Sequence, residues 1–157
     1  MLDKIFPQIH SEGYKFLVIF ALGTIILYFL NGFLGFIGLL LTIWVYYFFR
    51  DPERISINDD NYLTSPADGL VLQVIETNGP KELNLENKKF TKISIFMNVF
   101  DCHVNRSPCS GKLLDIMYKP GKFINASLDK ASEDNERNYY KIKNSLGEEI
   151  VVVQIAG

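Results

Sequence analysis

The longest feature of the sequence is an apolar run from Phe16 to Phe49, in which no charged residue occurs. As one helix this run would be about 50 Å long, well beyond the roughly 30 Å hydrocarbon core of a bilayer. The dipeptide Asn31-Gly32, a strong turn former, divides the run near its middle. The pattern therefore predicts two apolar helices, 16–30 and 33–49, joined by a turn near 31–32. We expect this helical hairpin to cross the membrane or to re-enter it.

Two features of the apolar run fit a hairpin packed at a membrane. Gly35 and Gly38 would let the two helices approach closely. Trp44, Tyr46 and Tyr47 would form an aromatic belt at the membrane–water interface. A buried hairpin in the core of a soluble protein is the alternative, and the length and uniform apolarity of the run disfavour it.

The charges beside the run predict its orientation. Lys4 and Lys15 precede it, and Arg50 and Arg54 follow it. Because Lys and Arg accumulate on the cytoplasmic side of membranes, both ends of the hairpin are expected there. We therefore expect a membrane anchor at 1–49 in the cell membrane, and a second domain, 50–157, on the cytoplasmic side.

Beyond the anchor the pattern changes to short apolar segments separated by turn residues. Strands are predicted at 70–75, 90–100, 112–118, 139–144 and 149–155, and a loop or short helical turn at 128–138. Short strands with regularly spaced turns are typical of a compact barrel or sandwich. The predicted fold is thus mainly β, or α+β for the chain as a whole.

Charge and cysteine content narrow the function classes. The formal net charge is −2 and Lys and Arg form no cluster, which argues against nucleic acid as a partner. The only cysteines, Cys102 and Cys109, are predicted to be free thiols in a reducing compartment. Together with His103 they could supply three metal ligands, but their spacing fits no standard zinc pattern, so no metal site is predicted.

The densest group of polar candidates lies between Asp101 and Arg106. If this segment stays extended, Asp101, His103 and Asn105 point the same way, because residues two apart share a face of a strand. A carboxylate beside the imidazole would hold it in one tautomer and raise its basicity. The alternative is an ordinary polar strand edge.

Five segments carry a resemblance to a known family. The stretch from Ile93 to Gly111 resembles the Asp-x-His-x-x-Arg/His-x-Pro-x-x-Gly region of phosphatidylserine decarboxylases, and of their short, membrane-anchored branch in particular. Two further motifs resemble those of the same family: Phe-Phe-Arg-Asp-Pro-x-Arg at 48–54 and Ser-Pro-x-Asp-Gly at 65–69. So are the segments 121–132 and 135–138, the latter containing Asn-Glu-Arg.

The resemblance implies a self-processed lyase. The proenzyme would cleave itself by serinolysis after Gly157, and the following Ser would become a pyruvoyl group on a small α chain. This chain would be the large β chain, and the second chain would complete its β domain. The pyruvoyl, bound to the amine of phosphatidylserine as a Schiff base, would act as the electron sink while CO2 leaves and phosphatidylethanolamine forms. The resemblance leaves room for a dimer of αβ units.

The resemblance also assigns roles to residues of this chain. His103 is expected to transfer the proton during decarboxylation, and Asp68 to take part in processing. Longer family members have a second His where this chain has Arg106. Either His103 serves both steps, or self-cleavage depends on Asp68 and backbone strain. The substrate-binding candidates are Asp101, Asn105, Arg106, Lys122, Asn135 and Arg137, of which Lys122 or Arg137 could receive the lipid phosphate.

The last residues bear on the same hypothesis. The chain stops on an apolar strand that ends in Ile-Ala-Gly, whereas natural domains usually finish with a few polar residues. We expect Gly157 to be the processing site, with a trimmed polypeptide as the plain alternative. The alternative in function is a non-enzymatic, membrane-anchored domain of hybrid-barrel type, acting as a carrier or scaffold. A lipoyl-type carrier would need an exposed Lys at a hairpin tip, commonly beside Met, and no such pair occurs.

Overall fold

The computed structural model describes residues 6–57, 59–125 and 134–157, which form two compact units. The first, called here the hairpin unit, comprises the chain up to Ser56 together with 67–69 and 97–106. The second, the strand unit, comprises 57–66, 70–96 and 107–157. Most of the loop or helical turn predicted at 128–138 lies outside the described residues.

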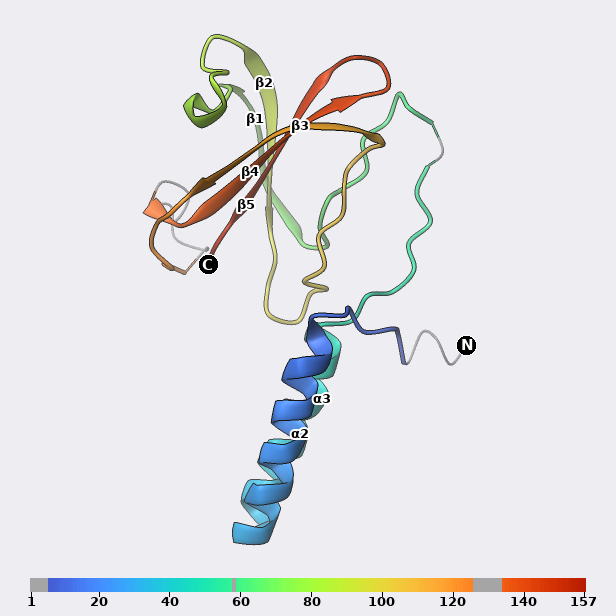
Figure 1. Cartoon of the computed structure of the whole chain (residues 1–157), viewed down its shortest axis with the longest axis vertical. Helices are drawn as coiled ribbons and strands as arrows, with labels where there is room; N and C mark the ends of the chain where they lie inside the picture. The colour runs from blue at the N-terminus through green and yellow to red at the C-terminus, as the bar shows by residue number, and fades with distance from the viewer. Residues whose placement is uncertain (1–5, 58, 126–133) are drawn as a thin grey trace. The chain divides into compact units, whose positions relative to one another are not determined.

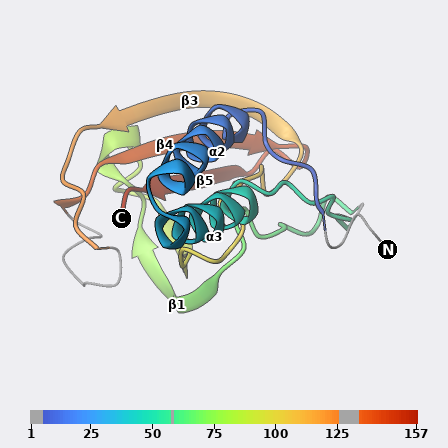
Figure 2. The same cartoon turned by 90° about the horizontal axis from the view of Figure 1, so that it is seen from below.

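The hairpin unit contains the two predicted helices, α2 (Gly13–Leu30) and α3 (Gly32–Phe48), which lie side by side (Figures 1 and 2). The break falls where the sequence predicts it. Asn31 is extended, and its side chain caps α3 by accepting a hydrogen bond from the Phe33 amide at 2.8 Å. By length and composition α2 could cross a membrane, whereas α3, with 17 residues, is a shorter apolar helix.

Small residues set the contact between the two helices. A Cβ atom at Gly35 would lie 2.7 Å from Tyr28 Cα, and one at Gly38 would lie 3.0 Å from Thr24 Cα. The Thr24 and Thr42 hydroxyls are 2.9 Å apart, within hydrogen-bonding distance across the pair. The prediction that Gly35 and Gly38 allow close approach is therefore confirmed.

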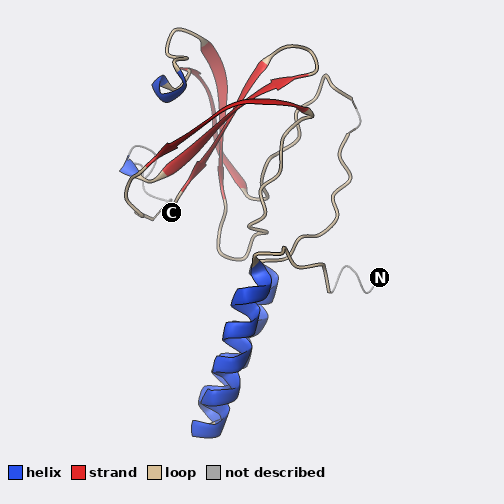
Figure 3. Cartoon of the chain, in the orientation of Figure 1, coloured by secondary structure: helices blue, strands red, loops and turns tan. Residues whose placement is uncertain are grey.

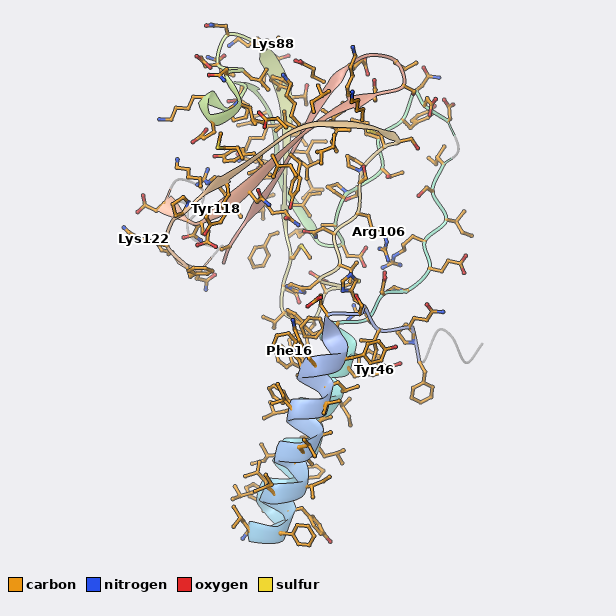
Figure 4. All side chains as sticks on the ribbon, viewed as in Figure 1. Phe16, Tyr46, Lys88, Arg106, Tyr118 and Lys122 are labelled. Atoms are coloured by element: carbon orange, nitrogen blue, oxygen red, sulfur yellow. The ribbon has the colours of Figure 1, made fainter. Side chains whose placement is uncertain are left out.

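The end of the hairpin where the chain enters α2 and leaves α3 is called here its foot; Phe16 and Tyr46 lie there (Figure 4). Main-chain hydrogen bonds tie the two segments together: the His10 amide donates to the Phe49 carbonyl at 2.9 Å, and the Asp51 amide to the Gln8 carbonyl at 2.6 Å. The Tyr46 hydroxyl donates to the Pro7 carbonyl at 2.7 Å. The foot is thus a defined structure and not a frayed helix end.

The strand unit contains two antiparallel sheets (Figure 3). One pairs β1 (Leu70–Asn78) with β2 (Lys89–Phe96), and the other has the order β3-β4-β5, with β3 at Gly111–Lys119, β4 at Arg137–Asn144 and β5 at Glu149–Ile155. A short 3-10 helix, η1 (Lys81–Leu83), lies between β1 and β2 in sequence. Within the described residues the sheets are not closed into a barrel, so the structure supports a mainly β, α+β fold.

A small apolar core joins η1 to the three-stranded sheet. Leu83, Leu85 and Tyr139 are buried, and Phe90 and Val151 pack against them. The Lys119 ammonium pairs with Glu82 at 2.9 Å, which connects β3 to η1. The two sheets therefore share one core.

One strand boundary differs from the sequence prediction. The predicted strand 90–100 ends at Phe96, and the residues from Met97 to Arg106 form a loop that belongs to the hairpin unit. Asp101 starts this change, because its carboxylate accepts a hydrogen bond from the Asn98 amide at 2.9 Å and stabilises a turn at 98–101. The predicted strand therefore does not continue through Asp101, His103 and Asn105.

Candidate active site

His103 lies at the foot of the hairpin, with its ring stacked on that of Phe48 in the last turn of α3. The ring centroids are 4.1 Å apart and the planes differ by 22°. The Nδ1 atom lies 3.1 Å from the main-chain carbonyl oxygen of Asp101. Because a carbonyl only accepts, Nδ1 carries the proton in this hydrogen bond, and Nε2 is the ring nitrogen left for chemistry.

The tautomer of His103 is therefore set by main chain and not by a carboxylate. The sequence predicted the Asp101 carboxylate in this role. In the structure that carboxylate caps the turn at Asn98, and only the carbonyl of Asp101 meets the imidazole. Asp101 thus contacts the imidazole, as predicted, but through its main-chain carbonyl and not through its carboxylate.

The loop that carries His103 is fastened to the foot by its neighbours. Cys102 is fully buried, and its thiol donates to the Arg50 carbonyl at 3.0 Å. Arg106 forms an ion pair with Asp51 and donates to the Pro52 carbonyl at 2.9 Å. These contacts hold both sides of His103 within the hairpin unit.

Asp68 also belongs to the hairpin unit, where its carboxylate pairs with the guanidinium of Arg54. Gly69 follows it with φ of +153°, a conformation that residues with a side chain rarely adopt. The chain bends at 66–69, around the Asp-Gly pair. Asn105, the remaining candidate of this unit, is exposed and donates to the Met97 sulfur at 3.4 Å.

The other predicted residues belong to the strand unit. Lys122, labelled in Figure 4, is exposed and pairs with Asp134 at 2.9 Å. The Nε of Arg137 donates to the Asn135 carbonyl at 3.2 Å. The predicted site residues thus form two groups: His103, Asp68, Asp101, Asn105 and Arg106 in the hairpin unit, and Lys122, Asn135, Arg137 and Gly157 in the strand unit.

Asn135 is the most enclosed of these candidates, with an exposed fraction of 1%. Its amide nitrogen donates to the carbonyls of Ile124 at 2.6 Å and Ala156 at 2.5 Å, and its oxygen accepts from the Ile124 amide at 2.8 Å. The Ala156 amide in turn donates to the Glu136 carbonyl at 2.8 Å. The main chain directly before Gly157 is therefore held on both its amide and its carbonyl side.

Among the pKa shifts in the strand unit, those of Cys109 and Tyr118 concern groups that ionise only at high pH. Burial, with the nearby Asp60 carboxylate, raises the pKa of the Cys109 thiol, which favours its neutral form. A hydrogen bond with Glu136 raises the pKa of the Tyr118 hydroxyl. Cys102 and Cys109 are both free thiols.

Comparison with known proteins identifies the family. The sequence profile of the family described as phosphatidylserine decarboxylase matches residues 41–157. A phosphatidylserine decarboxylase proenzyme of Pelagibacter ubique is 78% identical over all 157 residues, which cover 73% of that protein. The chain belongs to the phosphatidylserine decarboxylase family.

Two further members of the family agree with this assignment. The phosphatidylserine decarboxylase proenzymes of Ruegeria pomeroyi and Cereibacter sphaeroides are 51% and 50% identical over the whole chain, which covers 72% and 68% of them. The family predicted from the motifs is thus confirmed, and with it the prediction of a decarboxylase, a lyase that acts on phosphatidylserine.

Sequence reasoning missed three parts of the site. Phe48 was assigned only to the apolar run, although its ring positions the imidazole. Arg50 and Arg54 were assigned only to the membrane surface, although they contact the Phe100 carbonyl and the Asp68 carboxylate. The similarity of 48–54 to the family was the one signal in the sequence that could have pointed to them.

Proposed function

We propose that this chain is the large, membrane-anchored part of a phosphatidylserine decarboxylase, in which His103 gives a proton to the substrate carbon after CO2 leaves. The observation that carries the proposal is the position of His103 on Phe48, at the foot of an apolar helix pair. With the hairpin in a bilayer, this foot lies at the level of the lipid head groups. The imidazole would then meet its substrate at the membrane surface.

The contacts of His103 suit a general acid. With Nδ1–H donating to the Asp101 carbonyl, the imidazolium carries its second proton on Nε2. Stacking on Phe48 restricts ring rotation, so that Nε2 faces one direction. General acid catalysis by a positioned side chain contributes about 10²–10⁴-fold to a rate.

We propose further that the precursor cleaves itself after Gly157, with Asp68 in the proton-transferring group. Relatives of the chain are named proenzymes, which supports processing into two chains. The contacts of Ala156 with Asn135 and Glu136 support the position of the cleavage. Holding Ala156 restricts the main chain next to the Gly157 carbonyl, so that less entropy is lost when a neighbouring hydroxyl attacks it.

The prosthetic group in this proposal is a pyruvoyl on the small chain. Within the strand unit the residues present fit such a group, because Asn135 and Glu136 fix the segment before the processing bond. When present, the group supplies a carbonyl electrophile that takes up the electron pair left by CO2. The further substrate-binding candidates stay predictions: Asp101, Asn105, Arg106, Lys122, Asn135 and Arg137.

The second chain would also complete the β domain. Apolar side chains of β1 and β3 are exposed among the described residues, including Leu70, Leu72, Val74, Leu114 and Ile116. Uncovered strand faces of this kind are typical of a missing partner. About a quarter of the length of these relatives lies outside the matched region, and that remainder is the segment we expect to cover these strands and close the barrel. Pairing of two such αβ units stays a prediction.

Mass analysis of the complete gene product tests the processing part of this proposal. The expected result is two tightly associated chains, one ending at Gly157 and a smaller one that is blocked to N-terminal sequencing. Borohydride with phosphatidylserine should add the lipid to the small chain only. One unprocessed chain that retains decarboxylase activity would contradict the proposal.

A further inference from the structure

A groove of about 900 Å³ opens at the foot of the hairpin, entirely within the hairpin unit. Aromatic and charged side chains share its wall. The lining residues are Pro7, Trp44, Tyr47, Arg50, Pro52, Glu53, Arg54 and Phe100.

Arg50 is the cation of the groove best placed to bind an anionic ligand. Its guanidinium donates to the Tyr47 carbonyl at 2.6 Å and to the Phe100 carbonyl at 3.0 Å, so the group is held in one orientation. A guanidinium has five N–H donors, and these two hydrogen bonds leave others for a ligand. Arg54 adds a second guanidinium, whose charge the Asp68 carboxylate balances, and Glu53 adds a carboxylate. The planar donors of Arg match the oxygens of a phosphodiester.

The aromatic residues of the groove suit the apolar part of a lipid. The Trp44 indole N–H donates to the Val99 carbonyl at 3.1 Å and fixes the ring beside the 98–101 turn. Phe100 is 74% exposed although it lies next to an apolar helix pair. Trp and Tyr favour the level of a bilayer where acyl chains give way to head groups.

The groove and His103 are carried by the same two short segments. Phe48 stacks on His103, and Arg50, two residues later, lines the groove. Phe100 lines the groove three residues before His103. We propose that the groove binds the glycerophosphate part of the substrate phospholipid, with Arg50 on the phosphodiester and Trp44 and Phe100 beside the glycerol and upper acyl chains. This inference rests on the proposed function. It makes Arg50, in place of Lys122 or Arg137, the residue that binds the lipid phosphate.

Trp44 is the single tryptophan of this chain and provides a probe of the groove. The complete, processed enzyme in detergent would be titrated with dihexanoyl-phosphatidylserine below its critical micelle concentration. The signal is the fluorescence difference between the enzyme and its Trp44→Phe variant. We expect a saturable change, weaker binding of glycerophosphoserine, which lacks acyl chains, and no competition by inorganic phosphate at the same concentration.

Substitutions then assign the contacts. Arg50→Gln should weaken binding and raise KM about tenfold or more, with kcat changed much less, because a charged hydrogen bond is lost. The KM of Arg50→Lys should fall between those of the unsubstituted enzyme and Arg50→Gln. Phe100→Ala should weaken binding of the lipid but not binding of glycerophosphoserine. Lys15→Gln is the matched control, since Lys15 is a cation at the start of α2 that does not line the groove.

Three results would overturn the inference: an unchanged KM in a folded, processed Arg50→Gln enzyme, a tenfold loss in Lys122→Gln instead, or inorganic phosphate competing as well as the lipid. The failure of the proposed function looks different, because the unsubstituted enzyme would then lack decarboxylase activity. The fluorescence titration would still decide whether the groove binds the lipid.

Discussion

At the scale of single residues, main-chain groups orient the polar side chains that matter most. The imidazole of His103 is held by the Asp101 carbonyl, and the amide of Asn135 by Ile124 and Ala156. Main-chain partners add no charge, so they fix the direction of a group without a buried ion pair. The sequence names the side chains, but only the fold shows which carbonyls face them.

Asn135→Ala should slow self-processing and destabilise the protein by about 1–3 kcal/mol, because it removes the hydrogen bonds of a buried side chain to part-buried main-chain groups. Unfolding by denaturant and the rate of precursor cleavage would be measured together. Asn144→Ala is the matched control: Asn144 is also buried and bonds Glu148, at the turn between β4 and β5. Equal cleavage rates in the two variants would refute a positioning role for Asn135.

At the scale of helices and strands, the sequence pattern predicted those elements whose bounds depend on neighbouring residues. The break at Asn31 and the strands β3, β4 and β5 follow from turn residues and apolar periodicity, and their bounds agree with the structure to within three residues. The strand predicted to continue to Phe100 ends at Phe96, because contacts of Cys102, Arg106 and Phe100 with 50–52 hold the loop elsewhere. Those partners lie about fifty residues away in sequence, so no window of the sequence could reveal them.

An ion-pair cluster joins β4 and β5 to the residue before β2. Hydrogen bonds from Lys141 and Lys88 lower the pKa of Glu149 from its usual 4.5 to about 2. Because the pKa is lower in the folded state, the cluster stabilises the fold above pH 4.5, and this stabilisation is lost as the pH falls toward 2.

Glu149→Gln should therefore lower the unfolding midpoint at neutral pH, and its difference from the unsubstituted protein should vanish toward pH 2. Thermal unfolding in detergent across this pH range measures the difference. Glu86→Gln, at an exposed position, serves as the control and should show no such trend. A constant difference at every pH would show that Glu149 acts through packing and not through its charge.

At the scale of the whole molecule, the proposal places the chemistry at the foot of a membrane hairpin. Reporter tags at Met1 and directly after Phe49 should both be accessible from the cytoplasmic side only, because Lys and Arg lie at both ends of the apolar run. Protease protection in sealed cells and in lysed cells measures this. A protected tag after Phe49 together with an accessible one at Met1 would favour a single span over the hairpin.

The central claim is that His103 gives a proton to the substrate at the foot of the hairpin. The most direct measurement is decarboxylation by His103→Ala enzyme, with and without added imidazole, on samples whose processing is scored by mass. We predict a loss of about 10²–10⁴-fold that imidazole partly restores, and near-normal activity for His10→Ala, which alters the only other histidine. A His103→Ala enzyme that stays unprocessed would instead assign the residue to self-cleavage. A processed His103→Ala enzyme with activity within a factor of two of the unsubstituted protein would contradict the claim.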